Sequence, residues 1–319
     1  MKRTKEGYVD LKSNIPNWNK KRQKGEIIPS EGCGPYYQGW WIKNLDEEDW
    51  FLKVFNQKGI PYRFYVELLL EYLAQMVGIR TIESKIVEVN KQFKTYGLIS
   101  KDYRKKDCNI VSGKEIVLDF LKHLEKNHLL EEYLGIQKIS DLKNSISEYN
   151  SLDCVWDALN YRYSKFSNSN EIVTNNMNEL ARRYTFLFLM MQSDFHLGNW
   201  EMIEQGQSVF LAPVYDMDMS FRSSFDDYEK NNSMKSYLTS TQDVYQDFSN
   251  FYFSLPEKDQ IIIQNEILVL TPETIATAID FLPKIHSIEM PFSMKETILK
   301  RYNEHYQRIM DMIQNKRTR

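Results

Sequence analysis

A nearly continuous apolar run, Tyr-Thr-Phe-Leu-Phe-Leu-Met-Met, covers residues 184–191 of the chain. It closes a longer segment, 178–191, whose length and apolar content predict a buried helix. Polar residues follow immediately, and then two short segments are separated by Gln205-Gly206, the second of them an apolar run over 209–215. The pattern therefore predicts a buried helix, a polar loop and a β-hairpin with a glycine turn, in that order.

The first third of the chain has the pattern of a small sheet with one helix. Apolar positions spaced three and four residues apart predict a helix over 62–77, which Gly78 ends. A charged run, 101–107, follows the last predicted strand and is typical of a hinge. Strands are expected at 26–30, 36–43, 50–55, 81–90 and 93–100.

Beyond residue 111 the pattern is mainly helical. Polar segments at 161–178 and 222–247 are expected to be loops. We therefore expect an α+β fold with a small β-rich lobe, 26–101, and a large helical lobe, 102–319, preceded by an irregular basic arm, 1–25. Helices are expected at 113–127, 129–134, 140–150, 153–163 and 178–191, and again from 248 to the end.

The polar loop and the hairpin together carry three residues with a common chemistry. Asp194 lies in the loop after the apolar helix, Asn199 comes five residues later, and Asp216 ends the hairpin's apolar run. In phosphoryl transfer one carboxylate orients the attacking hydroxyl, while an amide oxygen and a second carboxylate hold magnesium. Magnesium prefers such hard oxygen ligands. The order and spacing predict an ATP-dependent phosphotransferase, although Asp-x-x-x-x-Asn alone is a weak signal.

Two features of the first lobe fit the same chemistry. Gly32 and Gly34 lie in a loop between two predicted strands, where glycine lets backbone N–H groups approach phosphates closely. Lys53 lies inside an apolar strand, so its ammonium group needs a partner or an open face. Glu67 and Glu71, one turn apart on the predicted helix, are the candidate partners.

The predicted hinge suggests where a nucleotide base would lie. Backbone groups from Ile99 to Lys101, where the apolar strand gives way to charged residues, are expected to face the adenine ring. Magnesium ATP is then expected between the two lobes.

The loop and the hairpin end resemble a known family. Asp-x-His-x-x-Asn at 194–199, followed by Ala-Pro-x-Tyr-Asp at 212–216, is similar to the HipA-type serine/threonine kinases and their shorter relatives. The resemblance implies a bilobal protein-kinase-like fold and a kinase that phosphorylates proteins, itself included. It implies that Asp194 accepts or orients the proton of the attacking hydroxyl. His196 would support the loop, and its alternative role is to be the general base itself.

The resemblance also assigns the remaining residues. Asn199 and Asp216 would hold magnesium, with Asp218 as an alternative to Asp216. Lys53 would bind the phosphates, and Glu67 rather than Glu71 would position it. Ser30 resembles the serine that the family phosphorylates in its own phosphate loop, but its spacing to glycine differs. The N-terminal subdomain of HipA is expected to be absent, which leaves antitoxin binding through that subdomain unsupported.

Two other functions remain open at this point. Antibiotic kinases also carry Asp-x-His-x-x-Asn, so a small-molecule acceptor is the first alternative. A pseudokinase that binds nucleotide without chemistry is the second, and the presence of Lys53, Asp194, Asn199 and Asp216 disfavours it.

Composition limits the partners. The net charge of −3 gives no strong attraction to nucleic acid, although the first 25 residues hold eight basic and two acidic residues. Three scattered cysteines, Cys33, Cys108 and Cys154, indicate neither a disulfide framework nor a zinc site. No apolar run is long enough to span a bilayer, and no apolar signal segment opens the chain. We expect a cytoplasmic protein that binds no nucleic acid directly.

Overall fold

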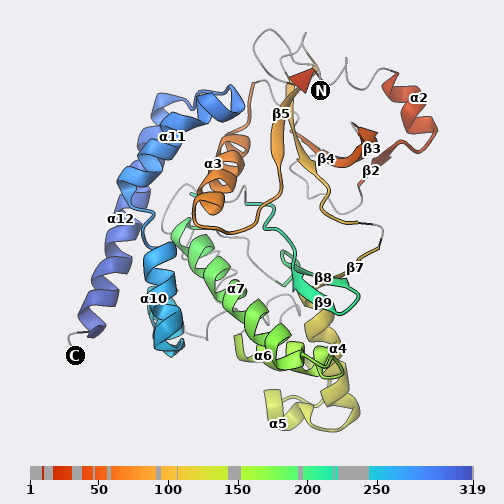
Figure 1. The fold of residues 1–319 in the computed structure, drawn as a ribbon, viewed down its shortest axis with the longest axis vertical. Helices are drawn as coiled ribbons and strands as arrows, with labels where there is room; N and C mark the ends of the chain where they lie inside the picture. Colours follow the sequence, from red (N-terminus) through yellow and green to blue (C-terminus); the bar gives the residue numbers. More distant parts are fainter. Residues whose placement is uncertain are drawn as a thin grey trace. The chain divides into compact units, whose positions relative to one another are not determined.

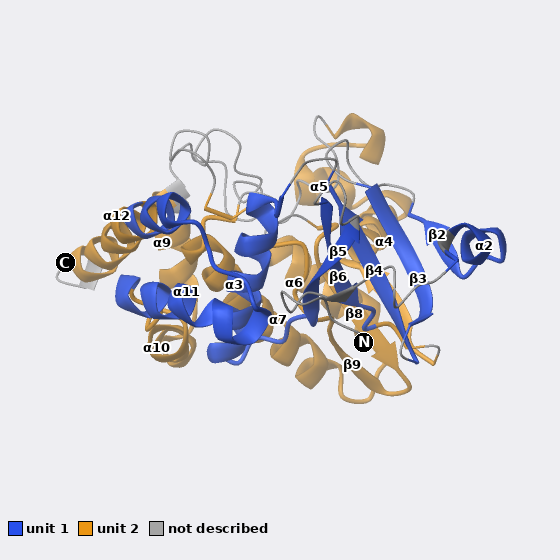
Figure 2. Cartoon of the chain, turned by 90° about the horizontal axis from the view of Figure 1, so that it is seen from above, with its two compact units in different colours: residues 1–103, 272–300 blue, residues 104–271, 301–319 orange. Residues whose placement is uncertain are grey.

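The structure, a computed structural model, divides into two compact units that are described separately (Figure 2). Unit 1 contains Met1–Tyr103 and Pro272–Lys300, and unit 2 contains Arg104–Thr271 and Arg301–Arg319. The predicted lobes met at residues 101 and 102, close to this division, but the prediction assigned 272–300 to the helical lobe. The structure describes residues 9–10, 17–30, 38–45, 47–55, 59–90, 95–105, 107–142, 152–192, 197–217, 220–221 and 244–317.

Unit 1 is built on a six-stranded sheet with the order β1-β5-β6-β4-β3-β2, of which Figure 2 labels the strands β5 to β2. Neighbouring strands are antiparallel except β1 and β5, which pair in parallel. Helix α3 (Tyr62–Met76) packs beside β5 and against α11 (Pro272–His286). The strands are β1 (Val9–Asp10), β2 (Ile27–Pro29), β3 (Gln38–Leu45), β4 (Glu48–Val54), β5 (Ser84–Asn90) and β6 (Thr95–Lys101).

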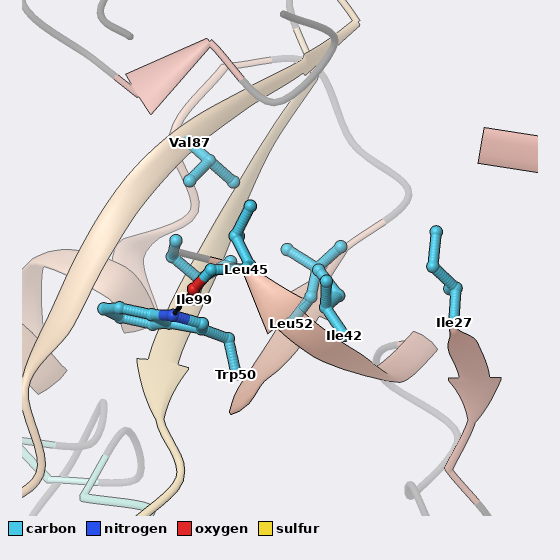
Figure 3. Close-up of a cluster of buried hydrophobic side chains, with 7 residues drawn as sticks. All are labelled: Ile27, Ile42, Leu45, Trp50, Leu52, Val87 and Ile99. Atoms are coloured by element: carbon cyan, nitrogen blue, oxygen red, sulfur yellow. Dashed lines mark hydrogen bonds between the residues drawn. The ribbon is translucent and has the colours of Figure 1, made fainter. Parts of the chain in front are cut away.

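A cluster of buried apolar side chains covers one region of this sheet (Figure 3). Trp50 lies in it, and its indole N–H donates a hydrogen bond to the carbonyl of Leu45 at 3.0 Å, which satisfies the ring's polar atom. Part of the strand pattern follows from this cluster, since its members Trp50 and Leu52 flank the more exposed Phe51 on β4. The members of the cluster are Ile27, Ile42, Leu45, Trp50, Leu52, Val87 and Ile99.

The expectation of an irregular arm over 1–25 is wrong in two places. Val9 and Asp10 form β1 opposite Val87 and Glu88, and Trp18–Gln23 form helix α2. A two-residue strand is too short to show a periodic pattern, and it forms only because it pairs with a strand far away in the sequence.

Unit 2 is mainly helical, with a three-stranded antiparallel sheet ordered β7-β8-β9 (Figure 1). The hairpin predicted around Gln205-Gly206 is present as β8 (Glu201–Gln205) and β9 (Ser208–Leu211), and β7 (Asn109–Ser112) pairs with β8. The helices are α4 (Gly113–Lys126), α5 (Leu130–Leu134), η1 (Ile139–Asp141), α6 (Leu152–Tyr163), α7 (Ser169–Leu189), α9 (Val244–Ser254) and α10 (Glu257–Glu266), and α12 (Phe292–Arg317) begins in unit 1 and ends in unit 2.

The predicted loop over 161–178 is also wrong, since α7 begins at Ser169. Its first turns bury Ile172, Val173 and Met177 at helical spacing, while the polar residues around them obscure the pattern. Buried Asn176 donates hydrogen bonds to the carbonyls of Ile172 and Val209, so a polar side chain joins the helix to β9.

The strand predicted over 209–215 ends earlier, at Leu211, two residues before Pro213. Proline has no N–H group for a sheet ladder, which accounts for this ending. Most of the helix predicted at 140–150 and of the loop predicted at 222–247 lies outside the described residues. Among the helices that the structure describes, none has the length and apolar character needed to cross a membrane.

Candidate active site

Lys53 and Glu67 form a buried ion pair in unit 1. The Nζ atom of Lys53 lies 3.0 Å from Oε2 and 3.2 Å from Oε1 of Glu67. Lys53 comes from β4 and is 5% exposed, and Glu67 comes from the middle of α3 and is 1% exposed. The predicted contact is therefore present, and both carboxylate oxygens face one ammonium group, which compensates the cost of burying the two charges.

Glu71 lies one turn further along α3 and is also buried, at 3% exposure. Its Oε2 accepts a hydrogen bond from the backbone N–H of Ser84 at 3.2 Å. The Ser84 hydroxyl in turn lies 2.8 Å from the hydroxyl of Ser100, its cross-strand partner on β6. Burial raises the pKa of Glu71 well above its ordinary value, and the nearby charge of Glu67 raises it further.

The segment expected to face adenine is the end of β6. Ile99 is fully buried and pairs with Leu52 on one side and Lys85 on the other. The N–H of Lys101 donates to the backbone carbonyl of Glu83, and the N–H of Asp102 donates to the backbone carbonyl of Asp49, both at 2.8 Å. These two N–H groups are engaged within the sheet, and adenine contact at Ile99 and Lys101 stays a prediction.

The loop that carries Asn199 rests on the start of helix α4 in unit 2. Lys114 N–H donates to the carbonyl of Leu197 at 2.9 Å, and Gly113 N–H donates to the carbonyl of Trp200 at 3.0 Å. Leu197 and Trp200 are both buried. A Cβ on Gly113 would lie only 2.3 Å from the Trp200 indole, so the loop and the helix approach as closely as glycine permits.

Asp216 is held by its backbone, close to the same loop. Its φ of 58° places it in the left-handed region, which Asp tolerates better than most residues. Its carbonyl accepts a hydrogen bond from the side chain of Gln192 at 2.9 Å. The hydroxyl of Tyr215 donates to the carbonyl of Gly198 at 3.4 Å. These contacts link the segment around Asp216 both to the end of α7 and to the loop of Asn199.

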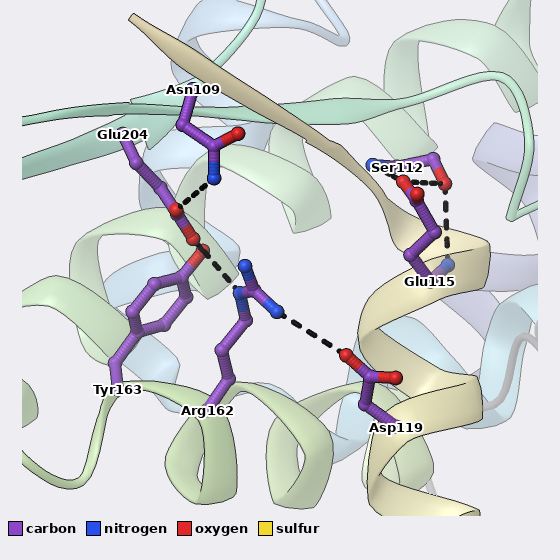
Figure 4. Close-up of polar contacts among 7 residues, drawn as sticks. All are labelled: Asn109, Ser112, Glu115, Asp119, Arg162, Tyr163 and Glu204. Carbon is purple, nitrogen blue, oxygen red and sulfur yellow. Dashed lines mark hydrogen bonds and ion pairs between the residues drawn. The ribbon is translucent and has the colours of Figure 1, made fainter.

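The hairpin between Asn199 and Asp216 is anchored by a polar cluster around Glu204 (Figure 4). Glu204 accepts hydrogen bonds from Arg162 Nε at 2.8 Å, Asn109 Nδ2 at 2.6 Å and the Tyr163 hydroxyl at 3.1 Å. Partial burial opposes its ionisation, but the hydrogen bonds and the charge of Arg162 leave its pKa below the ordinary value. The cluster fixes β8 to β7 and to the end of α6.

The end of α7, which leads to the loop, is tied to α12. His305 is fully buried, with Nε2 2.9 Å from the carbonyl of Phe188 and Nδ1 2.8 Å from the hydroxyl of Tyr245. A carbonyl only accepts, so Nε2 carries the proton and Tyr245 donates to Nδ1 of a neutral ring. Burial lowers the pKa of His305 to about 4, and the charge of Arg308 acts in the same direction.

Four predicted site residues lie outside the described residues: Gly32, Gly34, Asp194 and His196. Asp218, the alternative metal ligand, lies outside them too. Within the described ranges no group of three or more His, Cys, Asp or Glu side chains could hold a metal ion. Asn199 and Asp216 still offer an amide and a carboxylate oxygen on linked segments, and such hard donors fit magnesium.

Sequence reasoning missed the residues that support the site rather than form it. Gln192, Tyr215 and His305 bond to backbone carbonyls, and neither spacing nor residue type marks such contacts in a single sequence. Sequence reasoning identified Glu71 only as an alternative partner of Lys53. Its position one turn after Glu67 on a largely apolar helix was the signal that it must be either exposed or buried with a partner.

Comparisons with known proteins agree with this fold. The sequence profile of the HipA-like C-terminal domain matches residues 22–267. The crystal structure of the proinflammatory kinase CtkA from Helicobacter pylori is similar, with a TM-score of 0.58, 16% identity and coverage of 96% of each chain. HipA from Shewanella oneidensis MR-1, solved with HipB and operator DNA, has a TM-score of 0.54 and 14% identity.

The match to the Shewanella protein covers 88% of this chain and 65% of that one. No curated protein sequence matches the chain. The structural similarities confirm the predicted α+β class with a protein-kinase-like fold.

Proposed function

Because the chain belongs to the HipA-like C-terminal domain family, we propose that it transfers the γ-phosphoryl group of ATP to serine or threonine side chains of proteins, itself included. The observation that carries the proposal is the buried Lys53–Glu67 ion pair. A lysine held by both oxygens of a helix carboxylate is the arrangement that kinases use to position a phosphate-binding ammonium group.

The other residues of the proposal come from unit 2. Asn199 and Asp216 would supply oxygen ligands to magnesium, which neutralises phosphate charge when bound. Asp194 would accept or orient the proton of the attacking hydroxyl, and His196 would support that loop or, as the alternative, take the proton. The contacts of Tyr215 and Gln192 support a common task for the segments around Asn199 and Asp216.

The acceptor and the partners are part of the proposal. Ser30 is the first candidate for self-phosphorylation, since it follows β2 and precedes the two glycines. Its backbone N–H donates to Gly39 on β3 at 2.9 Å, so the chain around it is tied to the sheet. That the protein binds no nucleic acid directly stays a prediction.

A paired assay on wild type and Asp194→Asn tests this function. Thermal and urea unfolding would be followed with and without magnesium ATP, and transfer of label from γ-labelled ATP would be followed on the protein. ATP at about 100 times its dissociation constant should stabilise both proteins by roughly 2.7 kcal/mol. Labelling of the variant should be slower by roughly 10²–10⁴, the usual contribution of a general base.

Asp311→Asn is the matched control, because Asp311 is an exposed aspartate on α12. It should label at the wild-type rate, and mass spectrometry would locate the label. If magnesium ATP stabilised wild type and both variants but none of them became labelled, a small-molecule acceptor would be favoured. No stabilisation by ATP would reject the nucleotide site itself.

A further inference from the structure

The buried acidic pair on α3 has more negative charge than its lysine can neutralise. Glu67 and Glu71 are one turn apart and are 1% and 3% exposed, while Lys53 uses its ammonium group on both oxygens of Glu67. If both acids were ionised, the buried cluster would carry a net charge of −1. An uncompensated buried charge is costly, so a neutral second acid is the more stable arrangement.

The contacts of Glu71 fit a neutral carboxyl group. Its Oε2 accepts a hydrogen bond from Ser84 N–H, and its Oε1 has no hydrogen-bond partner among the described residues. The Ser84 hydroxyl also favours the ionised carboxyl, but less strongly than burial and Glu67 oppose it. A buried carboxylate normally receives several donors, or a cation, because its charge must be solvated by the protein. The raised pKa of Glu71, caused first by burial and then by Glu67, agrees with this geometry.

The groups that act on Glu71 come from three elements. Glu67 lies on the same helix, Lys53 lies on β4, and Ser84 lies on β5. Helix α11 also contacts α3, through the stacked rings of Tyr72 and Phe281, and none of its charged side chains is among the groups that perturb Glu71 in the described part of the chain. The charge state of Glu71 is therefore set first by burial and then by Glu67, which both favour the neutral form, against the opposing effects of Ser84 and Lys53.

Glu71 also joins the helix to the strands that lead to the hinge. Its carboxyl group bonds to Ser84 on β5, and the Ser84 hydroxyl bonds to Ser100 on β6, between Ile99 and Lys101. This chain of contacts runs from the helix that carries Glu67 to the segment expected to face adenine. Glu71 therefore connects the helix that positions Lys53, the predicted phosphate contact, with the strand end at Ile99 to Lys101, the predicted adenine contact.

We propose that Glu71 is a positioning residue for Lys53, the lysine proposed to bind the phosphates of ATP. As a neutral carboxyl it links α3 to β5 and, through Ser84, to β6, and Glu67 alone forms the ion pair with Lys53. As a carboxylate it competes with Glu67 for Lys53 and adds negative charge next to the group that binds anionic phosphates, which weakens ATP binding. This inference rests on the proposed function, since it assigns ATP phosphates to Lys53.

The first arm of the test measures stability without nucleotide. An acid whose pKa is raised by folding stabilises the protein at low pH, and this stabilisation is lost as the pH rises from the unfolded pKa toward the folded one. Urea unfolding of wild type and Glu71→Gln would be compared from pH 5.5 to 9. The ratio of their unfolding constants should change up to tenfold per pH unit, in favour of the variant as pH rises. Glu83→Gln, an exposed acid beside Ser84, should show no such slope.

The second arm measures the dissociation constant of magnesium ATP over the same pH range. Wild type should bind more weakly as pH rises, by several-fold across the titration, while Glu71→Gln should keep the low-pH affinity throughout. The KM for ATP should follow the same pattern and kcat should not, because Glu71 is not among the residues proposed to contact the reacting groups.

If the free energies of unfolding of wild type and Glu71→Gln changed in parallel with pH, the inference that Glu71 is neutral would be overturned. A stability slope with equal ATP affinities at every pH would reduce Glu71 to a structural residue and overturn its positioning function. If wild type binds no ATP at any pH, the proposed kinase function fails and the positioning function with it, while the stability arm still decides whether Glu71 is protonated.

Discussion

Replacing Gly113 by alanine tests how tightly the loop of Asn199 is held. A Cβ at this position would lie 2.3 Å from Cε2 and Cζ2 of Trp200 and 2.8 Å from Cδ2. Carbon atoms in contact are normally about 3.5–4.0 Å apart, so the indole or the start of α4 must move by roughly 1.2 Å. Trp200 is 2% exposed, so neighbouring groups enclose its ring, and the hydrogen bond from Gly113 N–H to its carbonyl keeps its backbone close to the added methyl group.

Two opposing terms determine the stability of Gly113→Ala. In an open helix, alanine is favoured over glycine by about 0.5–1 kcal/mol. Overpacking a rigid contact costs about 1–3 kcal/mol. Gly113 is the first residue of α4, where the helical gain is smaller, so we expect the free energy of unfolding to fall by about 1–2 kcal/mol. A displacement of about 1 Å in the loop of Asn199 should also lower phosphoryl transfer by roughly 100-fold.

Urea denaturation and the labelling rate measure these two effects. Lys114→Ala is the control, since Lys114 is the exposed neighbour in the same turn, and it should be close to neutral in both assays. Trp200→Phe removes the ring atoms that clash, so the double variant should lose less stability than the two single changes added together. A Gly113→Ala protein at least as stable as wild type would refute the reasoning, because it would mean that the contact yields without cost.

Two further predictions concern buried ionisable groups. Glu67→Gln removes the carboxylate bonded to the buried Lys53, so magnesium ATP affinity measured by calorimetry should fall. The variant should cost up to about 3–5 kcal/mol in urea unfolding, and less at a pH where Glu71 ionises in its place. Asp49→Asn in the half-exposed Lys43–Asp49 pair is the control and should cost less than about 1 kcal/mol. His305 has a pKa of about 4 in the folded protein against the ordinary 6.5, so the folded state binds fewer protons and stability falls as pH drops through this range. The expected loss is about 3 kcal/mol, and a wild-type slope that His305→Gln does not flatten would contradict it.

Local patterns predicted the elements whose buried faces are regular. Helix α3 and strands β3 to β6 were expected within a few residues of their bounds, because apolar side chains recur along them at fixed spacing. That Lys53 needs an acidic partner on α3 followed from a charge inside an apolar strand, and the resemblance to the family selected Glu67 over Glu71. Burial of an apolar face and pairing of a charge are requirements that a local pattern can express.

The rest depends on contacts between distant segments. The first turns of α7 are polar by composition and are helical because a few apolar side chains are buried against other elements, with Asn176 bonded to β9. The left-handed backbone of Asp216 and the fit of Gly113 against Trp200 are likewise set by neighbours that a one-dimensional pattern cannot identify. The placement of Asp194 and His196 stays a prediction.

The two-residue strand β1 has a practical consequence for studies of this protein. It pairs with the middle of β5, at Val87 and Glu88, and so covers one edge of the six-stranded sheet. The similarity to the family begins only at residue 22, so a shortened chain chosen from that boundary would lack β1. An uncovered edge strand is a template for pairing with another chain, and such a fragment should self-associate and precipitate more readily than the longer protein.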